Sequence, residues 1–432
     1  MWCIILPGFL ATATCGAVDG VTSSDANVDV QSMTFGYGDG TAEAAPPAPP
    51  AVVASTVEPC SDGFKTCRRN VFTTGWSTVS GQEEMRKGAA ALRCKFLSAA
   101  YTSDVVKMVI HEAGKKDKEL RKTKYSMMPV PYRVRMNPKL YIPHLRPETC
   151  KTPATPVTCA YIAFLLLGEP ASKGDWDALF GGAAVDFLAR SGVLMKVPGT
   201  HADYKAVVQI FPVDFDLAIA TDMTHVTFRD DYEDVMYIGA DSEGLVHNGV
   251  MAPAAKVLDL CTGSGIQAIA ALRYYADAAI LVDVNPRAVR FARFNLLLNG
   301  LDARGEVREG NLYSALTDAE REEGFDAVLA NPPFIPAPTL SAAESTFTVP
   351  NPNAGIDGLR PMPFYGDGGN DGERVMEAIV SGAGAVLKEG GRLSIVADIM
   401  DAFAYVAVPR FAGRRSQPRR LATPVALVDR PE

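Results

Sequence analysis

The stretch KVLDLCTGSGIQAIAALRYYA, Lys256–Ala276, decides the fold. Its first five residues are mostly apolar and predict a buried strand, and the segment from Ile266 onward predicts a helix. Between them lies DLCTGSG, in which Gly263 and Gly265 allow a tight turn and a close approach of the backbone to a ligand. This order of strand, glycine-containing turn and helix is typical of the first unit of a doubly wound sheet.

The same alternation continues downstream of this stretch. Apolar runs predict four more strands: AAILVDV, GEVREG, FDAVLA and RLSIVADI. Helices are predicted between them, one over PRAVRFARFNLLLNG, with Pro286 in its first turn and Gly300 as its stop, and one over all of residues 372–391. We therefore predict an α/β fold at 251–400, a doubly wound, mostly parallel, Rossmann-like sheet with ligands at the carboxyl ends of its strands.

The rest of the chain divides into four further segments. Residues 1–64 are a low-complexity leader, predicted to be disordered, and 65–157 are an extension of unknown role. Residues 158–250 show two helical patterns followed by the strand-like runs YKAVVQIFPV and DFDLAIATDM. That order predicts a small α+β module that resembles a winged helix; a plain α+β cap remains the alternative. Residues 401–432 are a basic tail in which RRLATPVALV can add a strand.

The composition argues against several classes of function and of site. The formal net charge of -8 argues against general, sequence-blind binding of nucleic acid. The eight cysteines include no C-x-x-C pair, so we expect no zinc site, no disulfide framework, and free thiols in a reducing, cytoplasmic setting. No apolar run reaches the ~18 residues of a membrane span. The apolar start of the chain has no Lys or Arg before Lys65, which leaves only part of the pattern of a targeting signal.

Asp283 indicates the class of cofactor. It ends the second predicted strand, twenty positions after Gly263. An acid at this position accepts hydrogen bonds from a ribose diol, so strand, loop and acid together predict an adenosine-type cofactor. A nicotinamide or flavin cofactor, held by its pyrophosphate, and S-adenosylmethionine both fit this much of the pattern.

The stretch VLANPPFIPAP, Val328–Pro338, separates these cofactors. The oxygen of Asn331 and the carbonyl of Pro332 can accept the two hydrogens of a planar amino group and aim its lone pair at a methyl donor. The paired prolines hold these acceptors rigidly, and Phe334 offers a face for stacking. Hydride transfer has no use for this arrangement, so S-adenosylmethionine is the predicted cofactor. A plain proline-rich loop with Phe334 in the core is the structural alternative.

Together, VLDLCTGSG, LVDVNPRAVRFARFNLLLNG, EGNLYSAL and FDAVLANPPF resemble class I S-adenosylmethionine-dependent methyltransferases with an NPPY/F motif. The resemblance is strongest to the "methyltransferase small" branch, with its HemK-like protein-glutamine and rRNA guanine methyltransferases. It implies a site at the target amino group made of Asn331, Pro332, Pro333 and Phe334. It also implies a cofactor site lined by Asp259, Cys261, Thr262, Gly263, Gly265, Asp283, Val284, Asn311, Leu312 and Asn331.

The chain departs from this family at three positions. Cys261 replaces a common Gly, Asn311 replaces an Asp that often contacts adenine, and Phe334 replaces the Tyr usual in HemK-like enzymes. The expected function is N-methylation of a planar nitrogen, preferably a glutamine-type amide in a protein, with an RNA base amine as the alternative. A non-catalytic adaptor that binds S-adenosylmethionine is the second alternative. We expect a protein or RNA acceptor, no membrane and no metal; the oligomeric state is open.

Overall fold

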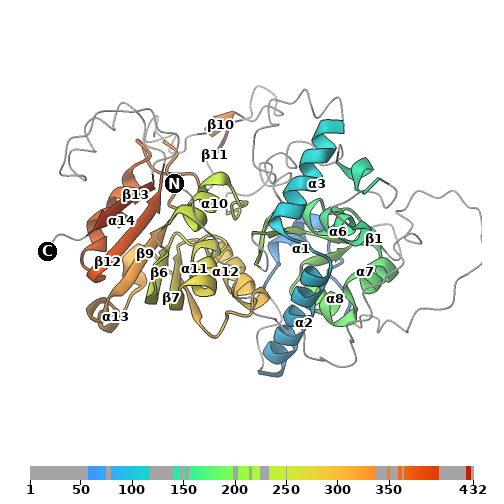
Figure 1. Ribbon diagram of the computed structural model, residues 1–432, viewed down its shortest axis with the longest axis horizontal. Helices are drawn as coiled ribbons and strands as arrows, with labels where there is room; N and C mark the ends of the chain where they lie inside the picture. The colour runs from blue at the N-terminus through green and yellow to red at the C-terminus, as the bar shows by residue number, and fades with distance from the viewer. Residues whose placement is uncertain are drawn as a thin grey trace, which may run out of the picture.

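The structure, a computed structural model, has two regions that lie side by side, a sheet with flanking helices and a helical module before it (Figure 1). The residues it describes are 57–73, 79–116, 141–145, 149–150, 155–197, 203–213, 217–223, 233–249, 251–336, 348–350, 359–361, 364–397 and 425–429. Most of the predicted leader and of the basic tail, including Arg410–Arg420, lies outside these residues.

The sheet has six strands in the order β13-β12-β9-β6-β7-β8. Five are parallel, as predicted, and β13 pairs antiparallel with β12 within the run RRLATPVALV and one residue beyond it. Their bounds are β6 Ala254–Leu260, β7 Ala276–Asp283, β8 Gly305–Glu309, β9 Phe325–Ala330, β12 Leu387–Val396 and β13 Val425–Asp429. In β6 and β9, Leu260 stands opposite Ala330, so the loops that follow these two strands begin at one edge of the sheet.

Helices connect the strands. They are α10 Ala240–Asn248, α11 Ile266–Tyr274, α12 Pro286–Leu298, η5 Leu312–Ala315, α13 Asp318–Glu323 and α14 Arg374–Ala383. The prediction of one helix over 372–391 is wrong, because α14 ends at Ala383 and β12 already begins at Leu387. The chain turns after Gly382 and Gly384. The N–H of Phe325 then donates to the carbonyl of Val386 (2.8 Å), which brings the following residues into the sheet.

The module before the sheet has the element order of a winged helix. Its elements are α1 Phe64–Arg69, α2 Val79–Ser98, α3 Ser103–Lys116, η3 Ile142–His144, α6 Pro156–Tyr161, η4 Ile162–Leu166, β1 Ala171–Ser172, α7 Lys173–Phe180, α8 Gly182–Arg190, β2 Leu194–Lys196, β3 Asp203–Ala206, β4 Val208–Pro212 and β5 Ala218–Asp222. From α6 the order is helix, strand, two helices and two strands, with the sheet order β1-β3-β2. The run YKAVVQIFPV contains two strands instead of one. Its second half is β4, which pairs with β5 in a separate hairpin. A further hairpin, β10 Thr348–Pro350 with β11 Leu359–Pro361, lies in the loop after β9.

In this module, α2 covers α8, the helix that a winged helix would insert into a nucleic-acid groove. The two helices pack through Gly88, where an added Cβ would lie 2.4 Å from the Cβ of Phe187. The buried residues of α8 include Ala184, Val185, Phe187, Leu188 and Ala189. Because α2 occupies its surface, α8 is a core helix here.

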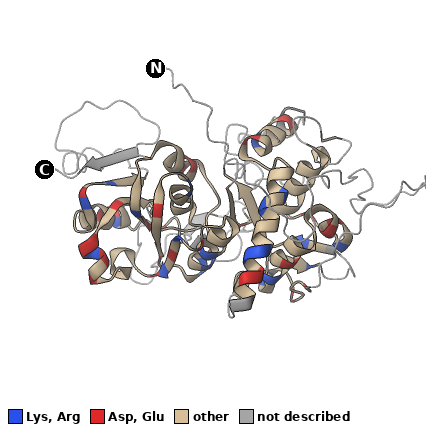
Figure 2. Ribbon diagram, turned by 60° about the horizontal axis from the view of Figure 1, so that its bottom comes forward, with Lys and Arg blue, Asp and Glu red and all other residues tan. Residues whose placement is uncertain are grey.

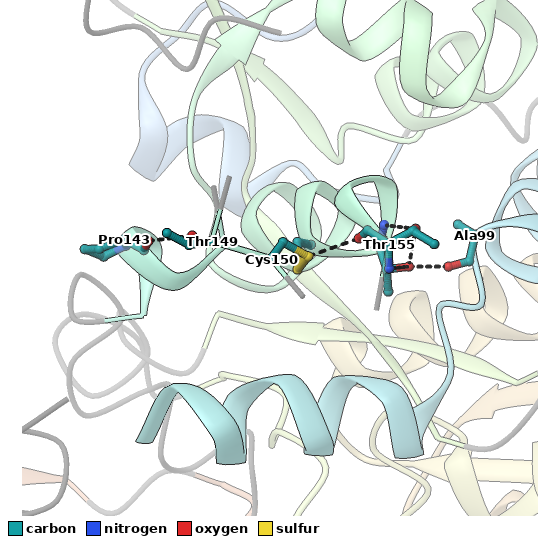
Figure 3. Close-up of a disulfide and its surroundings, with 7 residues drawn as sticks. Ala99, Pro143, Thr149, Cys150 and Thr155 are labelled. Atoms are coloured by element: carbon teal, nitrogen blue, oxygen red, sulfur yellow. Dashed lines mark hydrogen bonds between the residues drawn. A yellow bond between two sulfur atoms is a disulfide. The ribbon is translucent and has the colours of Figure 1, made fainter. Parts of the chain in front are cut away.

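Disulfides link residues near the start of the module and around α6, which corrects the prediction of free thiols. Cys60 is bonded to Cys67, and Cys150 to Cys159 at the start of α6 (Figure 3); Cys94 is disulfide-bonded as well. The prediction rested on chain length, but separations of seven and nine residues bring the paired Cα atoms to 5.7 and 6.2 Å. Such bonds are rare in reducing compartments.

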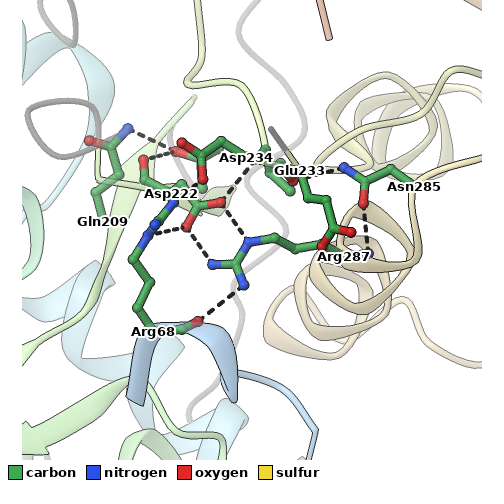
Figure 4. Close-up of polar contacts among 9 residues, drawn as sticks. Arg68, Gln209, Asp222, Glu233, Asp234, Asn285 and Arg287 are labelled. Carbon is green, nitrogen blue, oxygen red and sulfur yellow. Dashed lines mark hydrogen bonds and ion pairs between the residues drawn. The ribbon is translucent and has the colours of Figure 1, made fainter. Parts of the chain in front are cut away.

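A buried cluster of charges joins the two regions (Figure 4). The carboxylate of Asp222, at the end of β5, accepts hydrogen bonds from Arg68 of α1 and from Arg287 of α12. Arg68 also pairs with Asp234, whose pKa burial raises to about 7. Although burial acts to raise it, the hydrogen bond from Arg287 holds the pKa of Asp222 below its usual value. The main hydrophobic core likewise contains residues of both regions.

Candidate functional site

The loop between β6 and α11 carries the first group of predicted site residues. Asp259 is fully buried, and its Oδ2 accepts hydrogen bonds from the hydroxyl of Thr262 (2.6 Å) and the N–H of Ala268 (3.1 Å). Its other oxygen, Oδ1, is buried and has no hydrogen-bond partner among the residues that the structure describes. Burial raises the pKa of Asp259 to about 7, against the effect of these two hydrogen bonds. A buried oxygen in this state favours a cationic donor beside it.

Gly263 shapes the space above this loop. Its φ is +55°, and a Cβ added to it would meet no described atom within 4 Å. Its N–H donates to Oδ2 of Asp283 (2.8 Å). Gly265 differs, because its Cβ would lie within 3.3 Å of Ile269, Ala292 and Leu281 side chains. The first glycine therefore faces open space, and the second allows close packing of α11.

Asp283 ends β7 and is tied to both neighbouring loops. Its Oδ1 accepts the N–H of Asn285 (2.9 Å), and its Oδ2 accepts that of Gly263. Burial raises its pKa, and these backbone N–H groups partly oppose that rise. A carboxylate oxygen accepts more than one hydrogen bond, so Asp283 can also receive hydroxyl groups from a ligand.

The other predicted cofactor contacts surround these two acids. Val284 is 53% exposed directly after Asp283, an apolar surface next to a polar end. Asn311 is exposed, and Leu312 adopts a positive φ of 47°. Cys261 is half-buried, also with a positive φ, and burial raises the pKa of its thiol well above the usual value. Non-glycine residues in this conformation store strain, which is often found in binding loops.

The NPPF motif follows β9 at the same edge of the sheet. The side-chain amide nitrogen of Asn331 donates to Oδ2 of Asp241 (3.0 Å) and to the hydroxyl of Ser242 (3.2 Å). This contact fixes which branch of the amide is which, so the oxygen Oδ1 points away from these two residues. Pro332 is buried, and Phe334 packs half-buried against the core of the sheet. An amide oxygen fixed in this way is an acceptor for an N–H group.

A glycine-rich segment, residues 366–372, packs against the end of the motif and is hydrogen-bonded to the residue that follows it. The N–H of Ile335 donates to the carbonyl of Gly366 (2.9 Å), and Gly368 returns a hydrogen bond to Ile335 (3.0 Å). A Cβ on Gly372 would lie 2.4 Å from the carbonyl oxygen of Phe334, so only glycine allows this contact. Two acids of this loop, Asp367 and Asp371, accept N–H groups of the loop itself; Glu344 and Asp357, earlier in the loop after the motif, lie outside the described residues.

Asp241 and Ser242 were missed at the sequence level. They lie in the first turn of α10, about ninety residues before Asn331. The only signal was an acid at a helix N-terminus, which is common and is explained by the helix dipole alone. In the part of the chain that the structure describes, no three His, Cys, Asp or Glu side chains are placed to hold a metal ion. None of the described helices is long and apolar enough to cross a membrane.

Part of the chain is similar to known proteins. Residues 239–347 match the family model of the methyltransferase small domain. A release factor glutamine methyltransferase of Cereibacter sphaeroides is 33% identical over 154 residues, 35% of this chain and 50% of that protein. A ribosomal protein uL3 glutamine methyltransferase of Bradyrhizobium diazoefficiens is 34% identical over 24% of this chain and 33% of its own. A putative protein N5-glutamine methyltransferase of Methanocaldococcus jannaschii is 29% identical over 36% of this chain and 68% of its own. The chain spans about half of the length of the release factor enzymes that it matches.

Proposed function

Because residues 239–347 match the model of the methyltransferase small domain, we propose that the chain transfers a methyl group from S-adenosylmethionine to a planar nitrogen. The acceptor we infer is a glutamine-type side-chain amide in a protein. The single observation that carries the proposal is the fixed amide of Asn331, whose nitrogen is held by Asp241 and Ser242 at the end of β9.

The loop residues fit the proposed cofactor. The partnerless Oδ1 of Asp259 suits the ammonium group of the amino-acid part, and Asp283 suits the ribose hydroxyls. The open space over Gly263 leaves room for the chain between them. When bound, S-adenosylmethionine supplies an electrophilic methyl group.

The chain's own residues orient the acceptor nitrogen. In an amide, this nitrogen delocalises its lone pair into the carbonyl and is a poor nucleophile. Acceptance of its two hydrogens by Oδ1 of Asn331 and the carbonyl of Pro332 favours a tetrahedral nitrogen with a free lone pair. With S-adenosylmethionine bound, that lone pair would face its methyl group, the neutral thioether would be the leaving group, and the methylated nitrogen would then lose a proton to water. Positioning supplies most of the rate, and no strong base is required.

Three observations favour a protein acceptor over RNA. The relatives named above are glutamine methyltransferases. The helix that would grip a nucleic acid, α8, is covered by α2, and its nine residues, GAAVDFLAR, include one base, Arg190. Acidic and basic residues are also interspersed along the ribbon of both regions (Figure 2). Sequence-blind binding of nucleic acid needs clustered positive charge.

A labelling experiment tests the acceptor class. The chain is incubated with radiolabelled S-adenosylmethionine and a cell extract, and the products are digested separately with protease and with nuclease. Label that protease releases, and that amino-acid analysis assigns to methylglutamine, is the expected result. Label that only nuclease removes would make the RNA alternative the better one.

Titration calorimetry with S-adenosylhomocysteine tests the cofactor independently of any acceptor. We expect saturable binding, weakened by about 1.5–3 kcal/mol in Asp283→Ala, the usual range for hydrogen bonds to a charged group. Binding that is unchanged in a folded Asp283→Ala variant would remove Asp283 from the site. If the wild-type chain binds S-adenosylhomocysteine but methylates nothing in the cell extract, the non-catalytic adaptor is favoured.

A further inference from the structure

The β5 strand of the upstream module lies along α12 of the methyltransferase region, and α12 replaces a neighbouring strand. In the β4-β5 hairpin, alternate residues of β5 turn their backbone groups away from β4. At two of these, Ala218 and Ala220, both the N–H and the carbonyl bond to the side-chain amides of Asn299 and Asn295. At the third, Asp222, the side chain pairs with Arg287.

The asparagines of α12 meet the open backbone groups of β5 because the helix and the strand have similar repeat distances. Asn295 and Asn299 are four positions apart on a helix, a rise of about 6 Å. Two residues of a strand rise by about 6.6–6.8 Å, so successive outward-facing positions of β5 meet successive turns of α12. An asparagine amide has one acceptor and one donor group in the same plane, as a peptide unit has, and can therefore complete the open edge of a strand.

The two asparagines differ in their third hydrogen bond. The amide nitrogen of Asn295 also donates to the carbonyl of Ser264 (2.8 Å), between Gly263 and Gly265 of the cofactor loop. The amide nitrogen of Asn299 instead donates to the carbonyl of Asn295 within α12 (2.7 Å). Asn295 is completely buried and thus connects β5, α12 and the loop at one point.

We propose that Asn295 is a positioning residue that holds the cofactor loop in its binding conformation, with β5 of the upstream module as its anchor. Asn295 fixes the amide plane after Ser264, while Asp283 fixes the N–H of Gly263. The loop is thereby held from both sides, and the upstream module is part of the binding unit. The proposal rests on the proposed function only for the identity of the ligand.

The test compares Asn295→Ala with Asn299→Ala in the full chain. Each variant removes one amide from β5, and urea unfolding measures how much stability each loses. Only Asn295→Ala removes the bond to the loop. We expect its dissociation constant for S-adenosylhomocysteine, measured by calorimetry, to rise about tenfold, and that of Asn299→Ala to stay within about twofold of wild type. Should Asn295→Ala fail to fold, Asn295→Ser, whose shorter side chain cannot reach both sides, replaces it.

Hydrogen exchange of the loop amides, without ligand, gives a second readout. We expect faster exchange at residues 263–266 in Asn295→Ala than in Asn299→Ala. Equal affinities and equal exchange in the two variants would overturn the proposal. A wild-type chain that binds no S-adenosylhomocysteine would instead count against the proposed function, and the exchange measurement would still decide the role of Asn295.

Discussion

The two places where a ligand could be sought, the loop before α11 and the helix α8, differ in what a glycine does there. At Gly263 an added Cβ would point into open space, and in the same loop region Asp259 has a buried oxygen with no hydrogen-bond partner among the described residues. At Gly88 the Cβ would lie 2.4 Å from Phe187, because α2 closes tightly onto α8. One glycine keeps a surface open for a ligand, and the other allows a potential binding helix to be buried. An element order typical of nucleic-acid binding therefore does not establish that function.

The largest effect is expected where the two regions join. Asp222→Ala would leave the guanidinium groups of Arg68 and Arg287 buried without their shared carboxylate, at a cost of about 3–5 kcal/mol in the free energy of unfolding. Asp302→Ala, which removes the acid of the solvent-exposed pair with Arg86, is the control and should have a much smaller effect, because water screens that pair. Urea unfolding measures both. Two separate transitions in wild type would show that the regions unfold independently and would contradict a shared core.

The next largest effect is expected at the NPPF motif. Asn331→Ala should lower turnover by about a hundredfold or more, because an acceptor of the transition state is lost, and leave the affinity for S-adenosylhomocysteine nearly unchanged. Single-turnover kinetics and calorimetry measure the two quantities separately. A variant that loses cofactor binding and keeps its turnover would reverse the role assigned to Asn331.

The two glycines test the comparison itself. Gly88→Ala should destabilise the chain by about 1–3 kcal/mol through overpacking against Phe187, without changing cofactor affinity in the folded protein. Gly263→Ala should cost about 1–2 kcal/mol, because its φ of +55° strains any other residue, and should also weaken cofactor binding. Urea unfolding and calorimetry are measured on both variants, so that the loss of stability and the loss of affinity can be compared. An equal loss of affinity in the two would mean that α2 and the loop are not distinct in function.

Much of the sheet could be predicted from the sequence, because buried parallel strands are short apolar runs with turn residues after them. The strand Phe325–Ala330 and the roles of Gly263 and Asp283 as loop residues depend on local pattern alone. The β1-β3-β2 pairing, the disulfides and the Asn295 and Asn299 contacts depend on which segments meet in space. An asparagine on a helix gives no local signal that it completes a strand, and an acid in a first turn gives none that it orients an amide ninety residues away.

The smallest effect is expected for the residue that orients Asn331. Asp241→Ala removes one acceptor of the Asn331 amide nitrogen and leaves the hydroxyl of Ser242, so the amide is less firmly held. One hydrogen bond contributes about 0.5–1.5 kcal/mol, so turnover should fall by up to about tenfold, with cofactor affinity unchanged. A double-mutant cycle separates orientation from general damage. In the Asn331→Ala background the same substitution should have almost no further effect on turnover, because no amide remains to be oriented. A full tenfold loss in that background would mean that Asp241 acts on the reaction by another route.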